Sequence, residues 1–219
     1  MNSTILELKE VCKTYGADKT MATALKGVNL KLKKNALNLI LGPSGSGKTT
    51  LLNLASLLDT PTKGKITING QDTSQLSKSE RSKIRRDKIG IVYQRANLFP
   101  YLNVLENTML PMISKDINKA SKILNRVGIV ETTEFPDEIS IEKQQKTAIA
   151  RAMVNDPSLI IVDEPTGELD KSGAETIMDL ITEIKSKHTI LMASNNSDLT
   201  IYCDELFLIK NGYLRKSEE

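Results

Sequence analysis

The chain has 219 residues, and its 30 Lys and Arg against 27 Asp and Glu give a formal net charge of +3. This length suits one domain with an ample core, and the small charge excess gives no support to a nucleic-acid partner. No stretch approaches the ~18 consecutive apolar residues of a membrane-spanning helix, so we expect any membrane role to come through another protein.

The N-terminal part of the chain is predicted to form antiparallel strands. Polar and apolar residues alternate from Ile5 to Val11 and from Val28 to Leu32, which is typical of strands buried on one face. A further strand is expected from Lys65 to Ile68, ahead of an Asn69-Gly70 turn. The first ten residues are unlike a secretory signal peptide, and the two cysteines lack metal-ligand spacing; both observations favour a reducing compartment.

Four later segments are almost continuously apolar, which is typical of parallel strands buried on both faces. They are Leu37 to Leu41, Ile89 to Val92, Leu159 to Val162 and Thr189 to Met192. Helices expected at about Ser140 to Val154 and Lys171 to Lys185 alternate with these strands, which predicts right-handed crossovers. The fold class is therefore α/β, with a mainly parallel sheet and an antiparallel β subdomain.

A small helical lobe is predicted in the middle of the chain. Between Asn103 and Glu138 apolar residues follow a helical period, interrupted by Pro111 and closed by Pro136. We expect a single domain over 1–219, with a core at about 1–95 and 139–219 and the lobe at about 96–138. The basic run from Lys78 to Lys88 is expected to be a solvated helix face.

A phosphate-binding pattern, G-x-x-x-x-G-K-S/T, occupies Gly42-Pro43-Ser44-Gly45-Ser46-Gly47-Lys48-Thr49. It follows an apolar strand and precedes a helix that begins near Thr50, which is the structural context that this pattern requires. Glycine lets the backbone approach phosphates closely, and the N–H groups of the loop and of the helix start face the anion. Lys48 is expected to reach the β- and γ-phosphates, and the Thr49 hydroxyl is expected to ligate Mg²⁺.

Three polar side chains follow the predicted parallel strands at the edge where ligands bind. Asp163 is the candidate Mg²⁺ carboxylate and Glu164 the candidate general base. Gln94 is a candidate for contact with Mg²⁺ or with the attacking water. The alternatives are a pair of turn acids ahead of Pro165 and an ordinary residue at a strand end.

Together these features resemble the ATPase subunit of an ABC transporter, from about Ile5 to Arg215. Segments that carry the resemblance further are Ala148-Ile149-Ala150-Arg151-Ala152 and Ile160-Ile161-Val162-Asp163-Glu164-Pro165-Thr166-Gly167-Glu168-Leu169-Asp170. The resemblance implies a P-loop NTPase core, ATP and Mg²⁺ as cofactors, Gln94 as the Q-loop residue, and Tyr15 stacked on adenine. It also implies that two such subunits close head to tail, with each ATP held between a phosphate loop and the partner's signature sequence.

Within this family the chain is most similar to the subfamily of lipoprotein release, macrolide or peptide export and cell division. The similar segments are Ile84 to Gly90, Asn97 to Pro100, Glu106-Asn107 and Pro165 to Gly167. The resemblance implies a peripheral location at the cytoplasmic face of the membrane, with a permease bound through the Gln94–Leu110 region. For the apolar residues there, core packing is the alternative; they are Leu98, Phe99, Tyr101, Leu102 and Leu105.

Two departures from the family pattern affect the expected chemistry. The family's Leu-Ser-Gly-Gly-Gln signature is replaced by Ile139-Ser140-Ile141-Glu142-Lys143, so Ser140 is kept, for contact with the partner's ATP, and both glycines are lost. Ile141 adds bulk, and a carboxylate ~4 Å from a phosphate is repelled by several kcal/mol at an effective dielectric of about 20. The alternative role of Ser140 is to cap the helix that follows.

The second departure lies after the last buried strand, where the family has a histidine and this chain has Asn195. Asparagine still offers a hydrogen bond to a phosphate oxygen, but it cannot carry charge or shuttle a proton near pH 7. The only histidine, His188, precedes that strand and is expected on the surface.

The leading prediction is an ATP-binding subunit that powers or gates a membrane transporter by head-to-tail dimerisation, with weak or partner-dependent hydrolysis. The partner is a second copy or a sibling with an intact signature. The alternative is a non-hydrolysing, ATP-gated regulatory module bound to a permease-like protein. Small GTPases and nucleoside kinases are disfavoured, since the chain has no Asn-Lys-x-Asp run.

Overall fold

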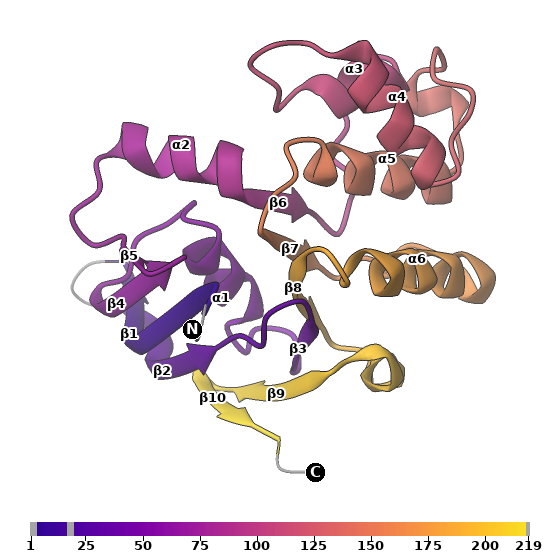
Figure 1. Cartoon of the computed structure of the whole chain (residues 1–219). Coiled ribbons are helices and arrows are strands. Elements are labelled where there is room, and N and C mark those ends of the chain that lie inside the picture. The colour runs from indigo at the N-terminus through magenta and orange to yellow at the C-terminus, as the bar shows by residue number, and fades with distance from the viewer. Residues whose placement is uncertain (1–3, 17–19, 218–219) are drawn as a thin grey trace.

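The computed structural model describes residues 4–16 and 20–217. Its strands form two sheets, and its helices lie mainly on one side and at one end of them (Figure 1). Among the described residues, no helix has both the length and the apolar character that crossing a bilayer requires.

The N-terminal strands form the predicted antiparallel sheet, in the order β2-β1-β4-β5. Its strands are β1 (Leu6–Tyr15), β2 (Ala22–Lys31), β4 (Lys63–Ile68) and β5 (Gln71–Asp72). Strands β1 and β2 are longer than the sequence predicts. The reason is an irregular register between Leu8 and Val11, where Glu10 adopts a positive φ of 48°, so the alternation of polar and apolar residues breaks while the pairing continues.

The second sheet has the order β10-β9-β3-β8-β7-β6 and contains all four of the expected buried strands. They are β3 (Leu37–Leu41), β6 (Ile89–Val92), β7 (Leu159–Asp163) and β8 (Thr189–Ser194), and they pair in parallel. Strand β9 (Glu205–Lys210) also runs parallel to β3. Strand β10 (Tyr213–Lys216) then pairs with β9 in the antiparallel direction. The sequence analysis does not predict β9 and β10.

The helices are α1 (Lys48–Ala55), α2 (Lys78–Lys88), α3 (Val104–Met109), α4 (Ile117–Arg126), α5 (Ile141–Met153) and α6 (Lys171–Ile184). There are also two short 3-10 helices, η2 (Pro136–Glu138) before α5 and η3 (Ser197–Tyr202) after β8. Helices α3, α4 and α5 lie together beyond the β6 and β7 end of the larger sheet (Figure 1). The predicted boundaries of the lobe stay a prediction, and the structure adds that α5 packs both on α3 and α4 and on β6.

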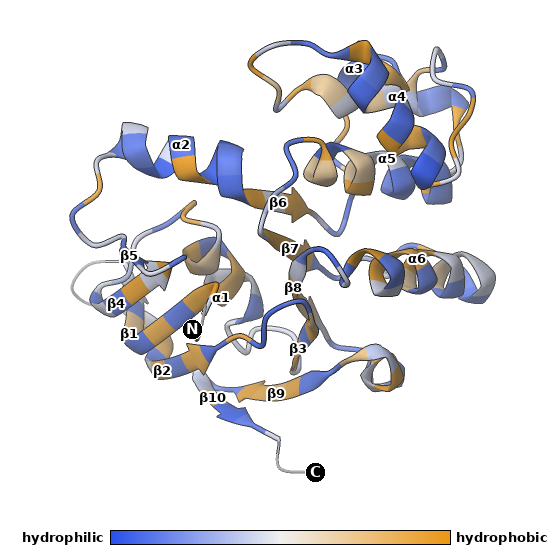
Figure 2. Ribbon diagram, viewed as in Figure 1, coloured by the Kyte–Doolittle hydropathy of each residue, from blue (hydrophilic) through white to orange (hydrophobic). Residues whose placement is uncertain are grey.

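Two apolar clusters form most of the core. One joins the larger sheet to the helices α5 and α6, and the other fills the space between the two sheets and around α1. Figure 2 shows the core strands as largely hydrophobic and α2 as mostly hydrophilic. None of the residues of α2, all of them described, is buried, which confirms the solvated face predicted for Lys78 to Lys88.

The expectation that His188 lies on the surface is wrong. Its side chain is 2% exposed, and its Nδ1 atom lies 2.7 Å from the carbonyl oxygen of Pro157. His188 directly precedes β8, all of whose residues are buried, and its contact to Pro157 satisfies the ring nitrogen.

Candidate active site

Most of the residues predicted to bind nucleotide line one pocket of about 490 Å³. It lies at the carboxyl ends of β3, β6, β7 and β8, where parallel sheets place their ligands. Its lining consists of Ala24, Ser44, Gly45, Gly47, Lys48, Thr49, Thr50, Gln94, Asp163, Glu164, Gly167 and Asn195. Five of the predicted site residues do not line this pocket: Gly42, Pro43 and Ser46 of the phosphate loop, Tyr15, predicted to stack on adenine, and Ser140, predicted to contact the partner's ATP.

Glycine is required at two positions of the phosphate loop. A Cβ atom on Gly42 would lie 2.3 Å from the carbonyl oxygen of Ile209, and one on Gly47 would lie 2.7 Å from that of Ala24. Gly47 also adopts a φ of +108°, which side-chain-bearing residues rarely do. The loop therefore packs closely against β2 and β9, and two of its N–H groups are used within the chain, that of Gly42 by the Ser194 carbonyl oxygen and that of Ser46 by the Pro43 carbonyl oxygen.

Lys48 lies at the centre of the loop and is 7% exposed. Its Nζ atom donates to the carbonyl oxygens of Gly42 at 2.8 Å and Pro43 at 3.2 Å, and it lies 3.5 Å from Oε1 of Glu164. Because the ammonium is anchored by the loop itself, it is preorganised for an anionic ligand.

Asp163 and Thr49 form the candidate metal site. The Thr49 hydroxyl donates to Oδ2 of Asp163 at 3.1 Å, whereas Oδ1 is buried and has no hydrogen-bond partner in the described part of the chain. Burial raises the pKa of Asp163, the Thr49 hydrogen bond opposes that rise, and the nearby charge of Glu164 adds to it. A buried carboxylate oxygen without a donor, next to a hydroxyl, fits a hard cation such as Mg²⁺.

The described residues contain no cluster of three His, Cys, Asp or Glu side chains able to cage a metal ion. Mg²⁺ commonly takes only one or two carboxylates and completes its shell with water and substrate phosphates. The donor set at Asp163 and Thr49 therefore fits a metal that arrives with a nucleotide.

Glu164 is held by four contacts. Its Oε2 atom accepts from the Ser194 hydroxyl at 3.0 Å and from the Asn195 N–H at 3.2 Å, while Oε1 faces Lys48. Its own N–H donates to the carbonyl oxygen of Ala193 at 3.0 Å. Sequence reasoning did not identify Ser194, which is 1% exposed; the available signal was a polar residue that ends a buried apolar strand.

Gln94 and Asn195 enter the pocket from neighbouring strand ends, and both are exposed. Gln94 follows β6 closely, and its amide nitrogen lies against Gly167, at 3.2 Å from the position that a Cβ atom there would take. Asn195 follows β8 and uses its main-chain N–H to bind Glu164. Both residues thus line the same pocket as the two acids.

Tyr15 lies at the end of β1 and is 41% exposed. Its hydroxyl donates to Oδ2 of Asp59 at 3.0 Å, and Nζ of Lys13 lies 4.9 Å from the ring centroid. The ring is therefore fixed at its tip and covered on one face by Lys13, which leaves adenine stacking on Tyr15 a prediction.

The degenerate signature begins α5 and makes its polar contacts locally. The Ser140 hydroxyl accepts from the Lys143 N–H at 3.2 Å, so the capping role is confirmed. Glu142 pairs with Lys146 at 2.6 Å, and Lys143 pairs with Glu134. Lys143 therefore does not neutralise Glu142, and Ser140 remains exposed at the surface.

The apolar residues after Gln94 divide into two groups. Leu98 and Leu105 pack on the core, as the core-packing alternative predicts. Phe99 and Tyr101 are 58% and 90% exposed, which suits the predicted contact with a permease. The fifth residue, Leu102, is partly exposed, so Phe99 and Tyr101 are the most exposed side chains of this set.

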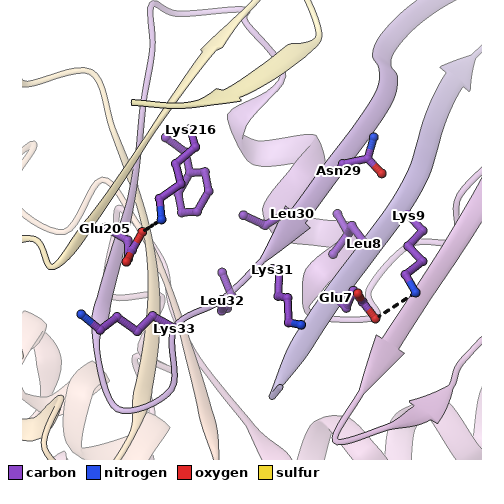
Figure 3. Close-up of a pocket in the computed structure, with 11 residues that line it drawn as sticks. Glu7, Leu8, Lys9, Asn29, Leu30, Lys31, Leu32, Lys33, Glu205 and Lys216 are labelled. Atoms are coloured by element: carbon purple, nitrogen blue, oxygen red, sulfur yellow. Dashed lines mark ion pairs between the residues drawn. The ribbon is translucent and has the colours of Figure 1, made fainter. Parts of the chain in front are cut away.

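A second groove, of about 590 Å³, lies between β1, β2 and the β9–β10 hairpin (Figure 3). Both of its carboxylates are already paired, Glu7 with Lys9 and Glu205 with Lys216. None of the predicted site residues lines it. The nucleotide site is therefore assigned to the pocket of the phosphate loop.

Comparison with known proteins finds relatives that are described as ATP-binding. A family model described as ABC transporter matches residues 25–167. An uncharacterised ABC transporter ATP-binding protein of Methanocaldococcus jannaschii is 38% identical, over 95% of this chain and 96% of that protein. The lipoprotein-releasing system ATP-binding protein LolD 1 of Rhodopirellula baltica is 36% identical, over 96% of each. The macrolide export protein MacB of a Shewanella species is 34% identical over the whole chain, which spans about a third (35%) of its length.

A solved structure of an ATP-binding cassette has the same fold as this chain. It is described as a dimeric post-hydrolysis state of an ATP-binding cassette bound to ADP and Pi, and it superposes with a TM-score of 0.90 at 36% identity. The match covers 97% of this chain and 98% of that one. The fold, the pocket and the relatives agree, and the chain belongs to the ABC transporter family of ATP-binding proteins.

Proposed function

We propose that this chain powers or gates a membrane transporter by ATP-driven, head-to-tail dimerisation, and that it hydrolyses ATP slowly or only with its partner. The observation that carries the proposal is the convergence of Lys48, Asp163 and Glu164 in a pocket to which the chain's own Ser140 does not contribute. The pocket thus has a phosphate loop, a metal carboxylate and a base, and it lacks the second half of a nucleotide sandwich.

A second subunit supplies that missing half. Ser140 is exposed at the start of α5, where it is available to a nucleotide on another chain. The solved relative described as bound to ADP and Pi is also described as dimeric, which supports this arrangement. The partner is a second copy of this chain or a sibling with an intact signature.

Each pocket residue has a distinct part in the proposed reaction. Lys48 binds the β- and γ-phosphates, and Thr49, Asp163 and Gln94 hold Mg²⁺, which supplies charge neutralisation at the phosphates when bound. Glu164, oriented by Ser194 and the Asn195 N–H, accepts the proton of the attacking water. The Asn195 amide donates a hydrogen bond to a phosphate oxygen.

Slow turnover follows from three side chains. Ile141, 51% exposed, and Glu142 occupy the positions where the family backbone approaches the opposite phosphate. Asn195 gives a neutral hydrogen bond where the family has a titratable histidine. In a mixed pair, a sibling's intact signature would cover this chain's ATP, and the degenerate signature would cover the sibling's.

The proposed place of the chain is the cytoplasmic face of the membrane, where it is held by a permease. The exposed side chains of Phe99 and Tyr101, within the Gln94–Leu110 region, are the proposed contact. The names of the relatives LolD and MacB, a lipoprotein-releasing system and a macrolide exporter, support a transporter partner.

The test is to purify the protein alone and to measure its association and its ATPase rate together. Sedimentation with ATP and Mg²⁺ is expected to reveal nucleotide-dependent association, and phosphate release is expected to be slow. A rate of several turnovers per second without any partner would contradict the degenerate site, and a strict monomer, both alone and mixed with an intact sibling, would contradict the dimer.

A second candidate function is a non-hydrolysing module in which ATP closes the dimer and holds a permease in one state. The side-chain contacts at the start of α5 favour it, since Ser140 is used as a cap and Glu142 presents a carboxylate. Replacing Glu164 separates the two functions, because only the enzyme depends on its base.

A further inference from the structure

The groove of Figure 3 lies where the outer strands of the two sheets meet. Strand β2 is the outer strand of the antiparallel sheet, and β10 is that of the larger sheet. The Lys26 N–H of β2 donates to the carbonyl oxygen of Gly212, just before β10, at 2.9 Å. A Cβ atom on Gly212 would lie 2.7 Å from the carbonyl oxygen of Ala24, so the two segments are in close contact there. Both strands continue from this contact to the groove, which is lined by their last residues, Lys31 and Lys216.

Beyond that contact, the outer side of β2 has main-chain groups without a strand partner. Lys31 lies opposite Glu7 of β1, and the next pair is hydrogen-bonded, since the Leu32 N–H donates to the carbonyl oxygen of Leu6 at 3.2 Å. Facing residues of an antiparallel pair alternate between hydrogen-bonded and non-bonded, so the N–H and C=O groups of Lys31 point away from β1. In the described part of the chain no strand pairs with that side of β2. Unpaired groups on a sheet edge are a template for a further strand.

The groove carries an excess of positive charge. Its lining contains four lysines and two glutamates. Both glutamates are already used by two of those lysines, Glu7 by Lys9 and Glu205 by Lys216. An anionic ligand therefore meets no carboxylate there that lacks a counter-charge.

The two other lysines, Lys31 and Lys33, are exposed and form no ion pair within residues 4–16 and 20–217. Asp204 feels the charge of Lys33 at longer range, but its carboxylate is bound by Lys185 at 2.9 Å and by the Leu37 N–H at 2.8 Å. Lys31 and Lys33 thus present two positive charges on the rim of the groove that are available to acidic groups.

Side chains alternate along this edge, as they do in a strand with one buried face. Leu30 and Leu32 are 3% and 4% exposed, whereas Lys31 and Lys33 are exposed. A strand added to β2 continues the same alternation, because side chains directly opposite one another lie on one face of a sheet. Acidic side chains at every second position of the added strand then lie beside the two lysines, and its other side chains lie on the apolar face.

The charges of this edge also decide which strand it accepts. A second copy that paired through the same edge would bring its own Lys31 and Lys33 close to those of the first, and like charges on facing positions destabilise a sheet. Lysines on sheet edges commonly prevent such self-pairing. An acidic strand turns the same repulsion into attraction, so charge complementarity selects it.

We propose that the groove between β2 and the β9–β10 hairpin binds an extended acidic segment of a partner protein, which adds as a strand to β2 with its carboxylates beside Lys31 and Lys33. The groove shares no lining residue with the nucleotide pocket. It is therefore a second contact surface of the chain, separate from the ATP site and from Phe99 and Tyr101.

Fluorescence anisotropy of a labelled peptide tests this site on the full chain. The probe is the hexapeptide Glu-Val-Glu-Val-Glu-Val, blocked at both ends, and its counterpart of opposite charge is Lys-Val-Lys-Val-Lys-Val. Physiological salt is used, so that long-range attraction is screened. The acidic peptide is expected to bind saturably, and the basic peptide is expected not to bind.

Lys31→Glu together with Lys33→Glu is expected to weaken binding of the acidic peptide about tenfold or more and to create binding of the basic peptide, because each reversed charge turns attraction into repulsion. Lys78→Glu together with Lys83→Glu is the matched control, since it makes the same change of net charge on exposed lysines of α2. ATP binding is expected to be unchanged in both variants, which also shows that they fold.

N-methylated peptides test the strand geometry without any change to the protein. A strand at the edge of a sheet donates hydrogen bonds to its neighbour from every second residue only. One acidic peptide carries N-methyl groups on its three glutamates and another carries them on its three valines. One of the two is expected to bind normally and the other to lose about tenfold or more in affinity.

Equal binding of the acidic peptide by the Lys31, Lys33 variant and the unmodified protein, or an equal loss in the α2 control, would overturn the groove as the site. Equal effects of the two methylated peptides would overturn strand addition. Phosphatidylserine vesicles that bind through Lys31 and Lys33, when the acidic peptide does not, would replace the partner protein by a lipid surface. Tighter peptide binding after Glu218→Gln with Glu219→Gln would show that these acids compete for the groove, and would overturn the partner protein as its occupant. All of these results leave the proposed function standing, since it is tested by association and phosphate release.

Discussion

The phosphate-loop pocket and the start of α5 are the two regions from which a nucleotide sandwich is built, and they differ in how their polar groups are satisfied. In the pocket, Lys48, Thr49, Asp163, Glu164 and Ser194 bind one another across three separate segments of the chain. At the start of α5, each polar group is bound by a near neighbour: Ser140 by Lys143, Glu142 by Lys146 and Lys143 by Glu134.

This difference shows which positions tolerate substitution without loss of stability. Removing one group from the pocket leaves a buried partner unsatisfied, which costs about 1–3 kcal/mol or more for a charged group. The start of α5 is exposed and its contacts are local, so Ile141 and Glu142 occupy it without cost to the core. The start of α5 therefore departs from the family signature while the fold is kept.

The largest expected effect concerns the base in the pocket. Glu164→Gln is expected to lower single-turnover hydrolysis by about 10²–10⁴-fold, the usual contribution of a general base, and to leave ATP-dependent association intact. Glu168→Gln is the control, since that side chain pairs with the exposed Arg95. Equal rates for Glu164→Gln and the unmodified protein would favour the non-hydrolysing module.

Next in size is the loss of the loop ammonium. Lys48→Met is expected to weaken ATP binding roughly 10- to 100-fold, because a hydrogen bond to a charged group contributes about 1.5–3 kcal/mol. Titration with a fluorescent ATP analogue measures it. Lys65→Met, which removes an exposed lysine paired with Asp72, is expected to bind normally. Similar affinities for both variants would move the nucleotide out of this pocket.

The start of α5 allows the opposite experiment, a gain of function. Replacing Ile141 and Glu142 together by glycine is expected to raise turnover of the self-associated protein about tenfold or more, since removing a nearby charge relieves several kcal/mol of repulsion. Val130→Gly removes another exposed apolar side chain as a control. Unchanged turnover in the double variant would place the limiting step at Asn195 or elsewhere in the pocket.

A smaller effect is expected at Tyr15, which lies at the end of β1. Tyr15→Leu is expected to weaken ATP binding about fivefold, near the lower end of base stacking on an aromatic ring, and Tyr15→Phe is expected to bind normally. Tyr213→Leu is a matched control, because that ring also has a lysine over it, Lys26 at 5.1 Å. If both leucine variants bind equally well, adenine does not stack on Tyr15.

The smallest effect is a pH-dependent one at Asp59, the anchor of Tyr15. Burial raises the pKa of Asp59, but hydrogen bonds from Lys13, Thr60 and Tyr15 outweigh it and hold the pKa below its usual value. A carboxylate with a lowered pKa stabilises the fold above its unfolded pKa of about 3.9 and loses that contribution as the pH falls through the lower, folded value.

Asp59→Asn is therefore expected to lower the free energy of unfolding by about 1 kcal/mol at pH 7, since its ion pair with Lys13 is only partly buried, and by nothing well below pH 4. Urea unfolding at several pH values measures this. In combination with Lys13→Met, the loss is expected to be smaller than the sum of the two single losses. A deficit that persists unchanged in acid would mean that packing, and not charge, is responsible.

Much of this structure is predictable because its signals are local. The four continuously apolar runs become β3, β6, β7 and β8, and the loop glycines and the acids after β7 meet as expected. By contrast, the irregularity at Glu10 conceals the true length of β1, and the short, partly exposed β10 has no pattern of its own. Local patterns identify elements, and they do not mark where one element is distorted.

Contacts between distant segments are the part that the sequence does not reveal. Nothing in the spacing links Ser194 to Glu164, Arg151 to Ala96, or His188 to Pro157. Each depends on which strand ends become neighbours in the folded sheet. Sequence reasoning thus predicted the groups that are proposed to perform the chemistry and did not identify the side chains that contact and orient them.

The backbone at Glu164 has a consequence for the stability of the pocket. Its φ of 45° lies in the left-handed region, which costs a residue with a side chain about 1–2 kcal/mol and costs glycine almost nothing. The carboxylate offsets this strain through its contacts with Lys48, Ser194 and the Asn195 N–H, because glycine would leave the buried Lys48 and Ser194 side chains without that partner. The pocket therefore stores backbone strain at Glu164 that its own polar contacts hold in place.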